Sequence, residues 1–145
     1  MINFEKVNQE RCKLNYDIWN LEKQKLNNLE YVEKYPKPRE IWFTKMWINI
    51  WDEQNWKEKF QRPVLILKKI WSLYFCISLT TKYKENFFYK KLNKVTFYEQ
   101  YKVKESIIVI SQAKVYDKKR FIKQIWYLEN NEFIKIKKIL KNIYF

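Results

Sequence analysis

The chain has 145 residues and no glycine, and this absence constrains its fold more than any motif does. Tight turns favour glycine, because a residue without a Cβ atom takes a positive φ angle at little steric cost. Glycine makes up roughly 7% of ordinary sequences, so about ten would be expected in a chain of this length. The same chain has seven tryptophans. The turns of this sequence can be interpreted only after the missing glycines are explained.

Codon usage explains part of this composition. Lys, Asn, Ile, Tyr and Phe, whose codons are rich in A and T, are abundant, whereas Pro occurs three times and His not at all. Tryptophan does not fit a simple drift toward A and T, because its usual codon is rich in G. Its enrichment indicates that the codon UGA is being read as a sense codon. The open question is whether UGA specifies tryptophan or glycine in the source organism.

The overall composition indicates one folded domain with an appended segment. Hydrophobic residues make up 47% of the chain and aromatic residues 19%, which is enough for a core. The best candidate for a membrane span, 63–79, is interrupted by Lys68 and Lys69 and is shorter than the roughly 20 residues that cross a bilayer. Residues 1–12 lack the basic and apolar regions of a signal peptide. We therefore expect a cytoplasmic protein with no membrane partner.

Metal sites and disulfides are not indicated, whereas a polyanionic partner is. Cys12 and Cys76 are far apart, and the chain has no histidine that would complete a zinc site. We expect two free thiols and no cofactor. The net charge of +14, from 30 Lys and Arg against 16 Asp and Glu, favours binding to nucleic acid. Because AAA encodes lysine, codon drift is an alternative source of this charge.

The hydrophobic pattern divides the chain into an N-terminal helical extension, 1–38, and a β-rich domain, 39–145, that ends in a helix. Apolar residues recur at helical spacing from about 3 to 34 and again from 131 to 143. Between these helices lie six short β-rich runs: 40–45, 63–69, 73–79, 87–91, 95–98 and 106–110. Short strands separated by polar turns predict a mainly β fold with flanking helices, and specifically a small closed barrel.

Three segments of the β-rich domain stand in an informative order. They are Glu53-Gln54 followed by Arg62-Pro63 and an aliphatic strand, then Ser78-Leu79-Thr80-Thr81-Lys82, then an aliphatic strand leading into Gln112, Lys114, Asp117, Lys118 and Arg120. Together they resemble the MazF/PemK family of toxin endoribonucleases from bacterial toxin–antitoxin systems, over the stretch from Arg39 to Leu140. The resemblance implies a small SH3-like β-barrel of the MazF, PemK and CcdB type.

The residues themselves agree with a site that handles phosphate. Pro63 lacks an N–H group and belongs at the start of a strand, so Arg62 lies at the strand mouth, where its donors can face a phosphate. Thr80 ends an aliphatic strand just before a basic turn, so its hydroxyl is expected to donate to the same phosphate. Each residue alone also fits a structural role, Arg62 as a solvated strand end and Thr80 as an ordinary β-branched strand residue.

The resemblance implies metal-independent cleavage of single-stranded RNA, in which the ribose 2′-OH attacks the adjacent phosphate and leaves a cyclic phosphate and a 5′-OH. Without histidine, the usual acid–base residue is absent. Arg62 is expected to stabilise charge on the phosphorane oxygens, because arginine stays protonated, and Thr80 to orient or donate to the same group. Glu53 is a candidate base or RNA contact, with a solvated loop carboxylate as the alternative. Which group moves the proton stays open.

Substrate binding is expected to use a second set of residues. Lys82, Lys84 and Lys114 are candidates for phosphate contacts, and Gln54 and Gln112 for base contacts. Simple solvation is the alternative for the lysines. The resemblance further implies a homodimer, a cognate antitoxin that blocks the RNA groove, and binding to operator DNA only in complex with that antitoxin.

Two other functions remain open from the sequence. One is a binding protein on the same barrel that inhibits a partner, as a gyrase-poisoning toxin does, with no nuclease chemistry. The other is a decayed relative that binds RNA without cutting it. The N-terminal helix has no counterpart in the family pattern, so it either extends the dimer or antitoxin surface or stabilises the domain as a cap.

Several tryptophans coincide with glycine positions of the family pattern. Trp47, Trp51 and Trp56 fall in the loop after the opening strand, Trp126 falls where relatives have Ile-Gly, and Trp71 lies at an expected turn between strands. We hypothesise that several of these are glycines in the natural protein, with UGA decoded as glycine. Indoles at such positions should be exposed or fit the backbone badly.

Overall fold

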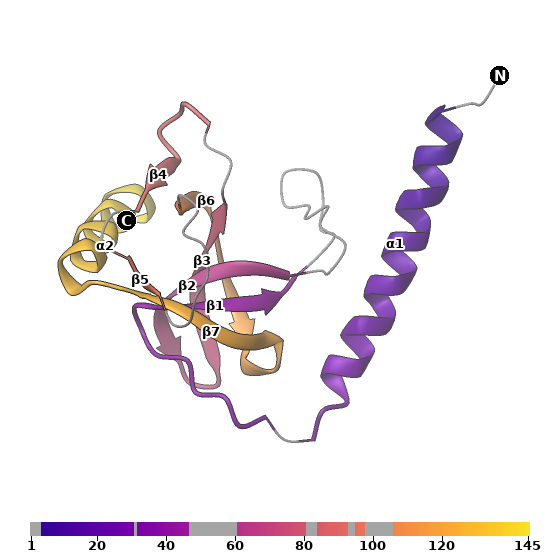
Figure 1. Cartoon of the computed structure of the whole chain (residues 1–145), viewed down its shortest axis with the longest axis horizontal. Helices are drawn as coiled ribbons and strands as arrows, with labels where there is room; N and C mark the ends of the chain where they lie inside the picture. Colours follow the sequence, from indigo (N-terminus) through magenta and orange to yellow (C-terminus); the bar gives the residue numbers. More distant parts are fainter. Residues whose placement is uncertain (1–3, 31, 47–60, 81–83, 93–94, 98–105) are drawn as a thin grey trace.

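Figure 1 shows the computed structural model of the chain, which describes all residues except 1–3, 31, 47–60, 81–83, 93–94 and 98–105. For 4, 5, 7, 8, 11, 12 and 95–97 it describes the backbone but not the side chains. The helices are α1 (Phe4–Asn27) and α2 (Asn130–Tyr144), and a 3-10 helix, η2, covers Lys118–Arg120. The strands are β1 (Glu40–Lys45), β2 (Gln61–Ile70), β3 (Leu73–Thr80), β4 (Tyr89–Lys91), β5 (Val95–Phe97), β6 (Ile107–Asp117) and β7 (Phe121–Leu128).

The described strands form one antiparallel sheet in the order β4-β6-β3-β2-β1-β7-β5. β1, β2 and β3 pair in sequence order, and β7 returns to the free side of β1. The mainly β fold with flanking helices is thereby confirmed. β4 and β5 lie at the two ends of the order, and no pairing between described residues joins them. The described sheet is therefore open, and closure into a barrel is not part of what it shows.

The larger core lies between one face of the sheet and α2. Phe133, Ile136 and Leu140 are buried on one side of α2, at the spacing that produces an apolar helix face. They pack with these buried strand residues: Ile41, Leu65, Leu67, Ile77, Leu79, Ile108, Ile110, Ile125 and Leu128. The Tyr144 hydroxyl donates a hydrogen bond to the Ile110 carbonyl and fixes the end of α2 to β6.

A second, smaller core occupies the opposite face of the sheet. Its buried members are Trp42, Met46, Val64, Ile66, Tyr74, Cys76, Tyr116 and Phe121. Val64 and Ile66 alternate along β2 with the Leu65 and Leu67 of the larger core, because successive strand residues point to opposite faces. The Phe121 ring meets two aromatic neighbours edge to face, with centroids 5.3 Å from Tyr74 and 6.0 Å from Trp42.

Several element boundaries differ from those expected from sequence. The expected strand 40–45 has the bounds of β1, but α1 ends at Asn27 rather than near 34. The Lys119 ammonium donates to the Asn27 carbonyl at 2.9 Å, so a distant side chain satisfies one carbonyl of the helix end. β6 continues past 110 to Asp117, and β7 was missed altogether. Irregular register between β1 and β7 breaks the period of two that reveals a strand.

The turn between β2 and β3 carries a tryptophan in an unusual conformation. Trp71 has φ of 56°, in the left-handed region that favours glycine, and its side chain is 94% exposed. The expectation of an exposed indole at this turn is confirmed. Trp126 differs, because it is half-buried and packs against the larger core. Trp47, Trp51 and Trp56 lie outside the described residues.

The described residues also bear on the expected free thiols and on the expected absence of a membrane span. Cys76 is a free, buried thiol, while the side chain of Cys12 is not described. Within the described ranges, no helix is long and apolar enough to cross a bilayer.

Candidate functional site

Three strand ends bring Thr44, Arg62 and Thr80 together on the face that carries the smaller core. Arg62, near the start of β2, pairs with Thr44, near the end of β1. The β2–β3 register, in which Val64 pairs with Ser78, places Thr80 opposite Arg62 when it is continued by two residues. Paired residues of an antiparallel sheet point to the same face. The sequence singled out Arg62 and Thr80, and they are neighbours across two strands.

The Arg62 guanidinium is half-buried and oriented by the main chain. Its Nε donates to the Leu79 carbonyl oxygen at 3.1 Å. Burial lowers the pKa of Arg62, while Tyr116 and Tyr89 act in the opposite direction. Arginine nevertheless stays a cation at neutral pH. Its two Nη nitrogens make no hydrogen bond to a described residue, so an oriented pair of donors is available to an anion.

Sequence reasoning missed Tyr116, which lies on β6 beside this cation. Tyr116 is 6% exposed, and its hydroxyl donates to Met46 Sδ at 3.9 Å. Burial raises the pKa of Tyr116 to about 12, although Arg120 and Arg62 lower it. The phenol is therefore protonated at neutral pH and is a donor rather than a base. Its place next to two arginines follows from strand register, which the sequence alone does not give.

Two buried hydroxyls lie in the same region. Thr44 and Ser78 are 0% and 1% exposed, and among the described residues neither Thr44 Oγ1 nor Ser78 Oγ has a hydrogen-bond partner. Ser78 is close enough to Tyr116 to lower the pKa of that phenol, although the two hydroxyls do not reach hydrogen-bond geometry. A buried polar atom without a partner is unusual in proteins and is common where function requires it. Thr44 pairs with Arg62, and Ser78 pairs with Val64 two residues along β2, so both hydroxyls belong to the face of the sheet that carries Arg62.

Some of the residues that are expected to bind substrate lie on this face of the sheet. Lys114 pairs with Cys76 of the smaller core, while Gln112 lies in the part of β6 where the register against β3 shifts, so strand alternation does not assign it to a face. Lys84 is exposed before β4, with its Nζ 5.9 Å from the ring centroid of Tyr89.

The remaining expected residues are not located. Glu53, Gln54 and Lys82 lie outside the described residues, so their roles stay predictions. In the part of the chain that the structure covers, no group of His, Cys, Asp or Glu side chains is arranged to hold a metal ion.

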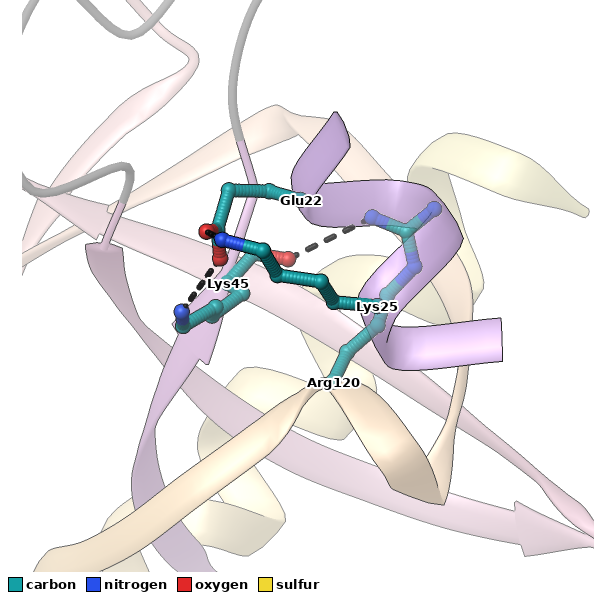
Figure 2. Close-up of polar contacts among 4 residues, drawn as sticks. All are labelled: Glu22, Lys25, Lys45 and Arg120. Carbon is teal, nitrogen blue, oxygen red and sulfur yellow. Dashed lines mark hydrogen bonds and ion pairs between the residues drawn. The ribbon is translucent and has the colours of Figure 1, made fainter. Parts of the chain in front are cut away.

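A cationic rim adjoins this site, formed by Lys45, Lys119 and Arg120. Lys45 follows Thr44 on β1, and Arg120 is near enough to Tyr116 to lower the pKa of its phenol. Figure 2 shows Arg120 reaching from the η2 corner toward the main chain of Lys45, where Nη1 donates to the carbonyl at 3.3 Å, while Glu22 of α1 meets the Lys45 ammonium. The rim therefore lies between the candidate site and α1.

Comparison of the chain with protein-family models and with curated proteins finds no match.

Proposed function

We propose that the protein is a metal-independent endoribonuclease that acts as the toxin of a type II toxin–antitoxin pair, similar to the MazF/PemK family. The observation that carries this proposal is the row Thr44, Arg62 and Thr80, in which one oriented guanidinium stands among hydroxyl groups. Such a group of donors suits a phosphate whose negative charge grows during reaction.

The chemistry follows the resemblance and uses this chain's own residues. The ribose 2′-oxygen forms a bond to phosphorus, the bond from phosphorus to the 5′-oxygen breaks, and the products are a 2′,3′-cyclic phosphate and a 5′-OH. Arg62 and the Thr80 hydroxyl donate to the non-bridging oxygens of the phosphorane. A base must take the 2′ proton and an acid must supply a proton to the 5′-oxygen.

The pKa of each side chain decides whether it can donate or accept a proton in this reaction. Tyr116 keeps its proton because burial raises its pKa to about 12, so it acts only as a donor, either to the phosphate or to the 5′-oxygen. Arg62 stays protonated at neutral pH, so it is a poor proton shuttle but stabilises negative charge well. Glu53, which lies outside the described residues, is the candidate for the base that the sequence pattern offers, with an RNA contact as its alternative role.

The proposal includes the small SH3-like barrel of that family and its homodimer. The antiparallel order β6-β3-β2-β1-β7, with α2 over one face, supports such a fold. A net charge of +14 supports an RNA substrate and an acidic antitoxin as partners.

Purified full-length protein, incubated with single-stranded RNA in excess EDTA, tests the reaction. The expected products carry a 2′,3′-cyclic phosphate and a 5′-OH, and RNA with 2′-O-methyl riboses should stay intact. Cleavage that requires added metal, or products with a 5′-phosphate, would contradict the mechanism. Intact RNA together with broken chromosomal DNA in expressing cells would favour the gyrase-poison alternative.

A further inference from the structure

The C-terminal half of α1 makes an ion pair with the cationic rim. Glu22 Oε2 accepts from Lys45 Nζ at 2.7 Å, and Glu22 Oε1 accepts from Lys25 Nζ at 3.1 Å (Figure 2). The side chains of Glu22 and Lys45 are only 19% and 30% exposed, so solvent screens their pair less than an ordinary surface pair. The hydrogen bond from Lys45 is the main reason that the pKa of Glu22 is lowered, so this carboxylate is ionised at neutral pH.

The other two rim cations are also engaged by α1. The Arg120 guanidinium carbon lies 5.7 Å from the ring centroid of Trp19, a distance typical of a cation–π contact. Lys119 donates to the Asn27 carbonyl at 2.9 Å. The helix thus holds all three rim side chains, by a carboxylate, an indole face and a carbonyl.

The attachment of α1 is narrow. Trp19, which is 4% exposed, is the one buried side chain among the described side chains of the helix. It belongs to neither core of the sheet. Two other apolar residues of the helix, Leu14 and Leu21, are 59% and 57% exposed, and Figure 1 shows the N-terminal half of α1 standing away from the sheet. Among the described residues, α1 is held by one indole and a few polar contacts, and a helix held in this way separates from its domain more readily than one with an apolar face in the core.

The rim is continuous with the proposed site for RNA. Lys45 is the residue after Thr44 on β1 and pairs with Gln61, so its side chain leaves the strand on the face opposite to Thr44 and Arg62, and the rim meets the site through Arg120. Arg120 and Arg62 both act on the same phenol, that of Tyr116. An RNA backbone bound at Arg62 would therefore meet the rim first at Arg120.

We propose that the rim is a second phosphate-binding site for the RNA strand, and that α1 occupies it in cis. The inference rests on the proposed RNA function and adds regulation to it. The helix supplies to each rim cation an acceptor that RNA would otherwise supply: the Glu22 carboxylate for Lys45, the Trp19 ring for Arg120 and the Asn27 carbonyl for Lys119. RNA and the docked helix then exclude each other at the rim.

The test compares Trp19→Ala with Leu21→Ala in the full-length chain. Neither change alters the charge, and Leu21 is an exposed residue of the same helix. Affinity is measured by fluorescence anisotropy with a short labelled single-stranded RNA whose riboses are 2′-O-methylated, so that it is not cut. Trp19→Ala should bind about five-fold more tightly than wild type, as expected for losing one cation–π contact that competes with RNA. Leu21→Ala should match wild type.

Salt dependence gives a second reading of the same variants. Each phosphate contact to single-stranded nucleic acid adds about 0.7 to the slope of log affinity against log salt, so recovering Arg120, the rim cation that Trp19 contacts, should steepen the slope of Trp19→Ala by about 0.7. Equal slopes and equal affinities for the two variants would overturn the inference.

Hydrogen exchange on the wild-type chain keeps the inference testable if Trp19→Ala folds poorly. Adding the RNA should lower the protection of backbone amides in residues 19–27, and unchanged or higher protection with RNA bound would overturn it. If wild type binds and cuts RNA while α1 stays docked, only the role of α1 is wrong. If no variant binds RNA, the proposed function is wrong, and the inference fails with it.

Discussion

At the scale of single residues, the site depends on a phenol that holds its proton. Burial raises the pKa of Tyr116 to about 12, above its value in an unfolded chain. Stability from this group is therefore present below about pH 10 and is lost as the pH rises toward about 12, a change of about 2 kcal/mol in the free energy of unfolding. Urea denaturation of wild type and Tyr116→Phe between these pH values measures it. The stability difference between the two proteins should shift by that amount, and a constant difference would show that the phenol ionises in the folded state as it does in the unfolded one.

The positive φ of Trp71 makes the glycine hypothesis testable in the protein itself. The other described residue with positive φ, Arg39, is held by hydrogen bonds from its backbone N to the Ile66 carbonyl and from its Nε to the Leu128 carbonyl, both at 3.0 Å. Trp71 has an indole that is 94% exposed, so its removal loses little burial. Trp71→Gly should raise the free energy of unfolding by about 1 kcal/mol, the approximate cost of a left-handed conformation for a residue with a Cβ atom.

The control for Trp71→Gly is its neighbour Ile70, which is 47% exposed in β2. Ile70→Gly should lower the free energy of unfolding by roughly 0.5–1 kcal/mol, because Ile70 is the last residue of β2, does not need a positive φ, and glycine loses more conformational entropy on folding. Equal losses for both variants would mean that the turn does not require glycine. At the level of the gene, UGG codons at Trp47, Trp51, Trp56 and Trp126 would contradict the UGA hypothesis.

At the scale of secondary-structure elements, α2 is held by one face and exposed on the other. Ile136 is 4% exposed in the larger core, whereas Ile134 on the same helix is 52% exposed. Ile136→Ala should lower the free energy of unfolding by about 2–5 kcal/mol, since the lost burial is joined by a cavity. Ile134→Ala should change it by less than about 0.5 kcal/mol. Urea denaturation of the two variants checks this pair, and similar losses would mean that α2 packs by a different face.

The bounds of the helices and strands also show which elements can be predicted from the sequence. β1, β3 and α2 were located closely because their apolar residues follow a regular period and their ends carry turn residues. The sequence did not predict β7, because the register of this strand against β1 is irregular. It predicted an α1 that extends too far, because the last carbonyl of the helix accepts a hydrogen bond from Lys119, which is distant in sequence. Such long-range partners leave no local signal.

Only part of the candidate site was predicted from the sequence, for the same reason. Arg62 and Thr80 were found because each stands at the end of a strand next to Pro63 or a basic turn. Thr44 and Tyr116 were not, since a threonine and a tyrosine in a strand are ordinary residues until the register places them beside a cation.

At the scale of the whole molecule, an antiparallel sheet separates two cores of unequal size. The larger core, covered by α2, carries most of the apolar burial. The smaller core contains polar groups at one end, where Arg62 and the cationic rim lie. A chain with net charge +14 and such an end is suited to bind a polyanion, and the rim contacts with α1 give it a means to limit that binding.

The rate of RNA cleavage in EDTA by Arg62→Ala, compared with wild type, tests the central claim most directly. Lys69→Ala is the matched control, because it removes an exposed cation from the other end of β2. Loss of a donor to the phosphorane should lower the rate about 100-fold or more for Arg62→Ala, and loss of the hydroxyl in Thr80→Ala should lower it about ten-fold. Lys69→Ala should cleave at nearly the wild-type rate. Cleavage by folded Arg62→Ala at the rate of Lys69→Ala would contradict the account.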